Sequence, residues 1–257
     1  MPRLALFLLL STFSLLVHAQ DRKLQFCYED HSVYPWVTGV KQGLVFYLLN
    51  KTEAELRLNF DLISLPWKRC LNEVKAGRIH AAIGASYIQD RAKWGTYPTD
   101  ANGSINKELR LFYANFFVYR RNDSAVRWHN QRFENLRQQS VGVQLGYSVG
   151  KDLEELGYPI TYLPASEDLV AVFKTKALEV IVLENSEADR VIAANPGLEN
   201  LMVKEDDPVK GGEQYLLFNT VYYNANSALA HSIWETLAKV RRSKAYQEER
   251  AKYISSK

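Results

Sequence analysis

The feature that most limits what this chain can fold into is a regular alternation of strand-like and helix-like segments. Short apolar runs predict strands at residues 24–28, 58–65, 79–85, 140–145, 160–163, 178–183 and 215–223. Segments with helical apolar spacing lie between them, and the chain ends in one long amphipathic stretch over residues 226–253. Strands that alternate with helices form parallel sheets, so the sequence predicts an α/β protein with two such sheets.

A polar segment at residues 99–110 separates the two runs of alternation and is predicted to be a surface turn or hairpin. An aromatic, extended stretch follows it at residues 111–120. We expect this stretch and the strand at residues 215–223 to be the two connections that cross between the two halves of the molecule.

The N-terminal residues 1–19 have the pattern of a secretory signal peptide. Arg3 precedes an apolar run at residues 4–17, and small residues before Gln20 suit a signal peptidase. The alternative is a membrane anchor, but a span needs about 20 apolar residues and this run is shorter. Cys27 lies beyond the cleavage point and follows the bulky Phe26, which disfavours lipidation. We expect a monomer free in the periplasm, with no membrane attachment.

Charge and cysteine usage narrow the possible partners. A net charge of +3 over 257 residues is too mild for a nucleic-acid-binding surface, so we expect no nucleic acid partner. The only two cysteines, Cys27 and Cys70, favour a disulfide in an oxidising compartment. Two separate buried thiols are the alternative.

Enzyme motifs are scarce in this sequence. It contains no phosphate-binding glycine loop and no cluster with metal-ligand spacing, so we expect no cofactor and no metal. Residues 146–150 match GxSxG, and Ser148 could be a nucleophile with His231 as its base. The simpler interpretation is a tight turn formed by the glycines, with Ser148 capping a helix whose N–H groups face a cleft.

Several segments, in this order and spacing, resemble the family 3 solute-binding proteins, the polar amino acid receptors of ABC importers. The similar segments are residues 34–36 (YPW), 66–71 (PWKRCL), 74–83 (VKAGRIHAAI), 141–146 (VGVQLG) and 179–184 (EVIVLE), together with Ser86 and Arg91. The resemblance implies a two-lobed type II periplasmic-binding-protein fold, each lobe a mainly parallel sheet flanked by helices. Lobe one would be residues 20–112 plus 213–257, and lobe two residues 113–212.

The resemblance also implies where a ligand carboxylate would bind. Arg91 stands where the family holds that carboxylate, and a guanidinium suits it through two parallel hydrogen bonds. Ser86 would donate to the same group, and the helix start at Ser148 would do so from the other lobe. The alternative for Arg91 is a weak surface ion pair with Asp90.

The opposite end of the ligand would meet other residues. Glu184 stands where the family usually has an Asp that pairs with the ligand amine; the alternative is a solvated acid at a strand end. Three aromatic residues could stack on the ligand or simply pack in the core, namely Tyr34, Trp36 and Trp67. His80 and Ile88 depart from the family pattern, which puts a standard α-amino acid ligand in doubt.

The expected function is therefore capture of a small amino-acid-like ligand between two lobes, without bond chemistry, for an ABC permease or a membrane sensor kinase. Two alternatives remain. The same fold hosts cyclohexadienyl or arogenate dehydratases, in which Glu184 would be the general acid or base. The other is an esterase that uses Ser148.

Overall fold

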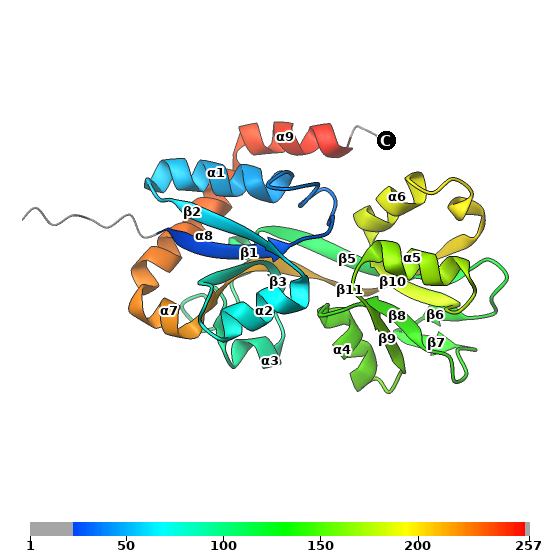
Figure 1. The fold of residues 1–257 in the computed structure, drawn as a ribbon. Helices are drawn as coiled ribbons and strands as arrows, with labels where there is room; N and C mark the ends of the chain where they lie inside the picture. The colour runs from blue at the N-terminus through cyan, green and yellow to red at the C-terminus, as the bar shows by residue number, and fades with distance from the viewer. Residues whose placement is uncertain (1–22, 255–257) are drawn as a thin grey trace, which may run out of the picture.

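The structure is a computed structural model that describes residues 23–254. It has two α/β lobes joined by one continuous curved sheet (Figure 1). The predicted signal peptide, residues 1–19, lies outside the described residues. No helix within residues 23–254 is both long enough and apolar enough to span a membrane.

Lobe one is built on three parallel strands. They are β1 (Leu24–Glu29), β2 (Phe60–Leu65) and β3 (Ala81–Ser86), with β1 in the middle. The helices that follow in sequence are α1 (Leu44–Leu56), α2 (Trp67–Lys75) and α3 (Gln89–Ala92). The short strand β4 (Gly95–Thr96) and the 3-10 turn Lys107–Leu109 complete this part of the lobe. Figure 1 shows α1 on one side of the sheet and α2 and α3 on the other.

Lobe two repeats this arrangement. Its parallel strands are β8 (Val141–Gln144), β9 (Ile160–Leu163) and β10 (Val180–Glu184). The helices are α4 (Ser148–Glu155), α5 (Ser166–Lys174) and α6 (Asn185–Ala193). Alternate residues of β10 enter different cores, because Val180 and Val182 cluster with α4 residues whereas Ile181 and Leu183 cluster with α5 and α6 residues. Helices therefore cover both faces of the sheet.

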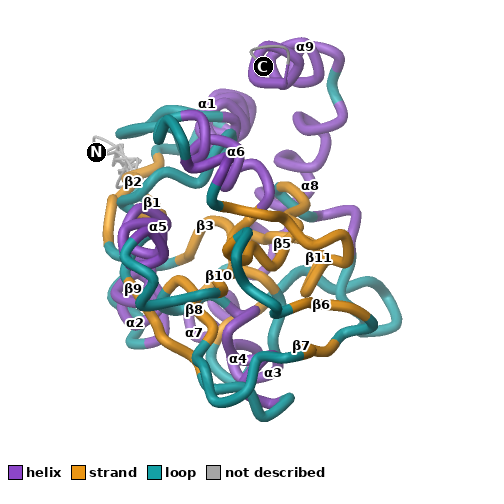
Figure 2. The backbone as a smooth tube through the Cα atoms, turned by 90° about the vertical axis from the view of Figure 1, so that its right-hand side faces the viewer, coloured by secondary structure: helices purple, strands orange, loops and turns teal. Residues whose placement is uncertain are grey.

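A small hairpin extends from lobe two. It consists of β6 (Arg127–His129) and β7 (Arg132–Glu134), which pair only with each other. Figure 2, which views the molecule from the side of lobe two, shows this hairpin on the right, on the opposite side of the view from β9. The 3-10 turn Leu198–Asn200 leads from α6 towards the return strand.

Two long antiparallel strands connect the lobes. They are β5 (Phe112–Arg121) and β11 (Met202–Asn219), and they merge the expected two sheets into one nine-stranded sheet. Eight of its strands follow the order β2-β1-β3-β11-β5-β10-β8-β9, and the ninth, β4, pairs with β11 beside this path. The prediction of two separate sheets was wrong for this reason. The first crossing lies at β5 as expected, but residues 215–218 already pair with β3 inside lobe one. The second crossing is therefore the preceding part of β11, and residues from Thr220 onward form helix α7 (Thr220–Ala225).

The C-terminal segment is two helices rather than the single predicted one. Helix α8 (Ser227–Arg242) ends at Ser243, whose backbone is extended, and α9 (Lys244–Ile254) starts in a new direction. The break lets α9 pack beside α1, where the rings of Tyr47 and Tyr246 lie 6.0 Å apart (Figure 1). In lobe one, Cys27 of β1 and Cys70 of α2 are joined by a disulfide.

Candidate ligand-binding cleft

A small enclosed cavity lies between the two lobes, beside the crossing strands. Its volume is about 50 Å³, enough for a few water molecules. Six of the predicted ligand-binding residues line it: Trp36, Trp67, Ser86, Arg91, Ser148 and Glu184. The structure therefore brings together residues that lie more than 140 positions apart in the chain.

Arg91 is buried at the boundary between the lobes and is only 5% exposed. It sits on the short helix α3, directly after β3. Its Nη1 donates to the carbonyl of Ser86 at 2.9 Å, and its Nη2 crosses the cleft to the carbonyl of Gly146 at 2.7 Å. The guanidinium carbon lies 5.8 Å from the centre of the Trp67 ring. The side chain points into the groove between the lobes and away from bulk solvent.

The charged guanidinium group of Arg91 donates its recorded hydrogen bonds to neutral groups. Both recorded acceptors are backbone carbonyls, and burial lowers the pKa of the guanidinium. The surface pair with Asp90 is not formed, because Asp90 instead pairs with Lys93 at 2.8 Å and with Lys151 of lobe two. A buried cation surrounded by neutral dipoles favours an anionic partner, which would neutralise it.

The two predicted serines differ in what they can offer. The hydroxyl of Ser86 already donates its hydrogen bond, to Gln214 Oε1 at 2.8 Å. Ser148 is 4% exposed, and its Oγ has no hydrogen-bond partner among the described residues. Ser148 is the first residue of α4, and the preceding Tyr147 is the N-cap, without a side-chain cap. The cavity therefore has a free hydroxyl next to a helix N-terminus on the side of lobe two.

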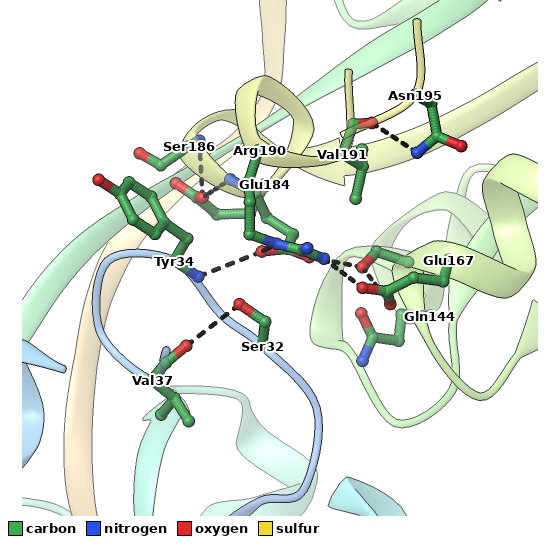
Figure 3. Close-up of polar contacts among 12 residues, drawn as sticks. Ser32, Tyr34, Val37, Gln144, Glu167, Glu184, Ser186, Arg190, Val191 and Asn195 are labelled. Carbon is green, nitrogen blue, oxygen red and sulfur yellow. Dashed lines mark hydrogen bonds and ion pairs between the residues drawn. The ribbon is translucent and has the colours of Figure 1, made fainter. Parts of the chain in front are cut away.

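Glu184 also lines the cavity. It is the last residue of β10 and also the N-cap of α6, accepting from the backbone N–H groups of Ser186 at 2.8 Å and Glu187 at 3.0 Å (Figure 3). At 6% exposure it is not a solvated strand-end acid. Burial raises its pKa to about 7 even though the two amides lower it. A nearby cation would stabilise the ionised form of this carboxyl.

A second buried carboxyl, Glu29, was missed by the sequence analysis. It is the last residue of β1, 6% exposed, and it lines the cavity. Its carboxylate accepts hydrogen bonds across the cleft from Gln144 Nε2 and, at 2.8 Å, from the hydroxyl of Tyr147. Burial raises its pKa to about 8. The sequence could have indicated Glu29 by its position at the end of a predicted strand, because ligands bind at the carboxyl ends of parallel strands in such sheets.

The aromatic residues divide into cavity walls and packing. Trp36 is stacked on Phe112, with ring centroids 4.3 Å apart, and its indole N–H is buried without a partner in the described part of the chain. Trp67 lies against Arg91. Tyr34 lies outside the cavity: its hydroxyl donates to the carbonyl of Tyr253 at 2.7 Å, and its ring contacts that of Tyr253. The expectation that Tyr34 stacks on the ligand is therefore corrected, since α9 takes up its side chain.

Polar contacts hold the lobes together around the cavity. Besides the bonds of Arg91 and Glu29, the backbone N–H of Tyr34 donates to Glu187 of lobe two at 3.2 Å (Figure 3). Glu187 is itself held by Arg190 through its Nε at 2.9 Å and by the hydroxyl of Ser166 at 2.6 Å. Several hydrogen bonds therefore join the two lobes at the seam around the cavity.

The geometry does not support a catalytic serine. The proposed base, His231, lies in α8 of lobe one, where its Nε2 is 2.9 Å from the hydroxyl of Tyr223. Ser148 has no described hydrogen-bond partner that could accept its proton. Within residues 23–254 there is also no group of three or more potential metal ligands.

Comparison with known proteins identifies the fold. No protein-family model matches the sequence, and no curated protein matches it. Among solved structures, a histidine kinase sensor domain with similarity to periplasmic binding proteins matches at TM-score 0.74 and 17% identity, over 91% of this chain and 96% of the other. The arginine-, lysine-, histidine-binding protein ArtJ of Geobacillus stearothermophilus matches at TM-score 0.72 and 18% identity, over 92% and 96%.

A third similar structure is the substrate-binding protein of an amino acid ABC transporter, at TM-score 0.69 and 16% identity, over 91% of this chain and 99% of the other. These likenesses extend over nearly the whole of each chain. Together with the two α/β lobes and the paired crossing strands, they show that this chain has the two-lobed periplasmic-binding-protein fold.

Proposed function

We propose that this protein is a periplasmic receptor that closes its two lobes over a small amino-acid-like ligand and presents it to an ABC-type importer or to a membrane sensor. The observation that carries the proposal is the buried guanidinium of Arg91, which reaches across the cleft and whose recorded acceptors among residues 23–254 are two neutral backbone carbonyls. A ligand carboxylate would replace the bond to Gly146 with a charge-assisted, bidentate one.

The charge distribution along the cavity matches a ligand with two opposite charges. The guanidinium of Arg91 and the free hydroxyl of Ser148 favour an anion at one end. The carboxyls of Glu184 and Glu29 favour a cation, because an ammonium or guanidinium group would reverse the rise in their pKa that burial causes. The indole of Trp36 provides an apolar wall between them.

The small volume of the cavity indicates how the receptor would be loaded. Residues of the two lobes hydrogen-bond to one another across this cavity of about 50 Å³, so an entering ligand would take over contacts that the side chains now make with one another. The seam bonds of Arg91 and Glu29 would be exchanged for bonds to the ligand. A ligand that bridges the lobes favours the closed state by its differential affinity.

The similar structures support a binding role through their fold. Those described above include an amino acid transporter's binding protein, a binding protein for basic amino acids and a sensor domain. Transport and sensing use the same closed form, so the proposal covers both.

Thermal denaturation of refolded, ligand-free protein would test the proposal. The panel would comprise the common amino acids, polyamines and small carboxylates, and small-angle scattering would follow closure. We expect at least one compound with both a carboxylate and an amine to raise the melting temperature, because a ligand that binds only the native state stabilises it. A panel without any stabilising compound would contradict the proposed function.

A second candidate function, a dehydratase, is favoured by one observation. Glu29 and Glu184 are buried carboxyls with raised pKa that line the same cavity as Arg91, the arrangement expected of a general acid beside a substrate carboxylate. Incubation with prephenate or arogenate, followed by ultraviolet absorbance, would detect loss of water. Turnover that disappears in Glu184→Gln would establish this reaction in place of simple binding.

A further inference from the structure

A second pocket lies behind the ligand cavity, in lobe one, and has a volume of about 180 Å³. Its walls come from the start of β5, the end of α8 and the start of α9. Trp36 and Phe112 line both this pocket and the ligand cavity. The stacked pair, with ring centroids 4.3 Å apart, is the partition between the two spaces.

Three arginines line this pocket: Arg110, Arg241 and Arg250. The side chain of Arg241 is 13% exposed, and its Nε–H is buried without a partner among the described residues. Its Nη2 donates to the carbonyl of Glu108 at 2.9 Å. Arg110 donates through Nη1 to the carbonyl of Lys107 at 2.8 Å.

The positive charge in this pocket is only weakly balanced. The recorded acidic partner of Arg110 and Arg241 is Glu108, whose carboxylate oxygens lie 3.6 Å and 4.0 Å from the two guanidinium groups. The Glu108 side chain is 69% exposed, so water screens this contact. Burial and the neighbouring Arg110 lower the pKa of Arg241. The positive charges of Arg110 and Arg241 lie close together, and the Nε–H of Arg241 is without a partner among the described residues. An anion in the pocket would compensate these charges.

We propose that this arginine pocket, defined by Arg110, Arg241 and Arg250, binds a small doubly charged oxyanion of the phosphate class. Guanidinium groups suit phosphate because their planar N–H pairs match its oxygens. The exposed Arg250 and the 13%-exposed side chain of Arg241 line the same pocket, so a single anion can contact more than one arginine. Tyr113, which is 46% exposed, flanks the pocket and could also face a substituent on the phosphate.

The test uses the full secreted chain with inorganic phosphate as the probe. Calorimetric titration and thermal denaturation would be run in phosphate against chloride at constant ionic strength, so that general screening is removed. We expect saturable binding of one phosphate and a rise in melting temperature. Phenyl phosphate would be titrated in parallel, and tighter binding than that of inorganic phosphate would place its ring against Tyr113.

Variants would locate the phosphate. Arg241→Gln should lower the affinity for phosphate about tenfold, because one charged hydrogen bond is lost. Arg250→Gln changes an exposed side chain that lines the pocket, so it gives a second test if Arg241→Gln folds poorly. Arg242→Gln, an equal charge change at an exposed residue that does not line the pocket, should bind as the wild type does. Arg91→Ala should also bind phosphate normally, which separates this pocket from the ligand cavity.

The proposal would be overturned by the absence of saturable phosphate binding, or by equal binding in Arg250→Gln and the wild type. Loss of phosphate binding in Arg91→Ala would also overturn it, because the anion would then lie in the cleft.

Discussion

The two ends of the ligand cavity hold their charges in different ways. At one end, Arg91 projects from a short helix and spans the cleft to a carbonyl of the other lobe, so its position depends on closure. At the other end, Glu184 is fixed within lobe two by the first amides of α6, whether or not the lobes meet. Glu29 belongs to lobe one but depends on lobe two for both recorded hydrogen-bond donors.

This difference separates recognition from closure. Glu184 is prearranged and can meet a ligand amine in the open form, as expected of a residue held by a helix N-terminus. Arg91 and Glu29 reach their final contacts only when the lobes meet, so a ligand that engages them stabilises the closed form. Under the proposed function, Arg91 and Glu29 would therefore couple ligand affinity to closure, and Glu184 would contribute selectivity.

The largest effect is expected at the anion end. Arg91→Ala should weaken binding of the ligand found in the thermal panel by about 1.5–3 kcal/mol, roughly 10- to 150-fold, because a charged hydrogen bond is lost. Calorimetry measures this change. Lys93→Ala, at an exposed residue on the same segment, should leave the affinity unchanged. Equal affinities for Arg91→Ala and wild type would remove Arg91 from the site.

Glu29 should make closure depend on pH in the ligand-free protein. Its pKa is about 8 in the closed form and returns towards its ordinary value, near 4.5, when the cleft opens to water. The closed form therefore binds the proton of Glu29 more tightly than the open form does. This preference for the closed form is complete below about pH 4.5 and is lost as the pH rises through about 8. The closed-to-open ratio should fall by up to about tenfold per pH unit in between.

Small-angle scattering between pH 5.5 and 8.5 would detect this opening as an increase in the radius of gyration. Glu29→Gln cannot ionise and should show a smaller change. If the variant opened over the same pH range and to the same extent as the wild type, another group would control closure.

Glu184→Gln should weaken binding of the same ligand about tenfold, since the ligand amine loses its charged partner. The amide oxygen of the new side chain can still cap α6, so the melting temperature of the ligand-free protein should change little. Glu199→Gln is the matched control, because Glu199 is exposed on the same lobe. Unchanged affinity in Glu184→Gln would mean that the ligand amine lies elsewhere.

The smallest effect is expected for Tyr34→Phe. The Tyr34 hydroxyl bonds to α9 outside the cavity, so its loss should cost about 0.5–1.5 kcal/mol of stability and change ligand affinity less than about twofold. Chemical denaturation and calorimetry would measure the two quantities. A strong loss of affinity without loss of stability would put Tyr34 back at the ligand.

Much of the fold could be predicted because the buried parallel strands are short apolar runs between helical segments. The continuous sheet could not, because the first part of β11, residues 202–214, is rich in charged residues and glycine and lacks an apolar pattern. Its pairing with β5 holds it in the sheet, and that pairing is visible only in the tertiary structure. Ser243 likewise interrupts a stretch whose local periodicity continues across it.

The candidate site shows the same division. Arg91, Ser86 and Glu184 were predicted through the resemblance, and all three line the cavity: Ser86 and Glu184 end strands β3 and β10, and Arg91 lies on α3. Glu29 could not be distinguished from the adjacent surface acid Asp30 by sequence, because the residues that contact it, Gln144 and Tyr147, come from the other lobe. Tyr34 was placed wrongly because nothing in its own segment indicates that α9 covers it.

The central claim is that one cavity recognises opposite charges at its two ends. Calorimetric titration with three matched compounds tests it directly: the amino acid that binds best, its decarboxylated amine and its deaminated acid. We predict tight binding of the amino acid alone, with each partner compound weakened at least about tenfold by the loss of one charged contact. Equal binding of the amine or of the acid would contradict the account, because one end of the cavity would then be without a role.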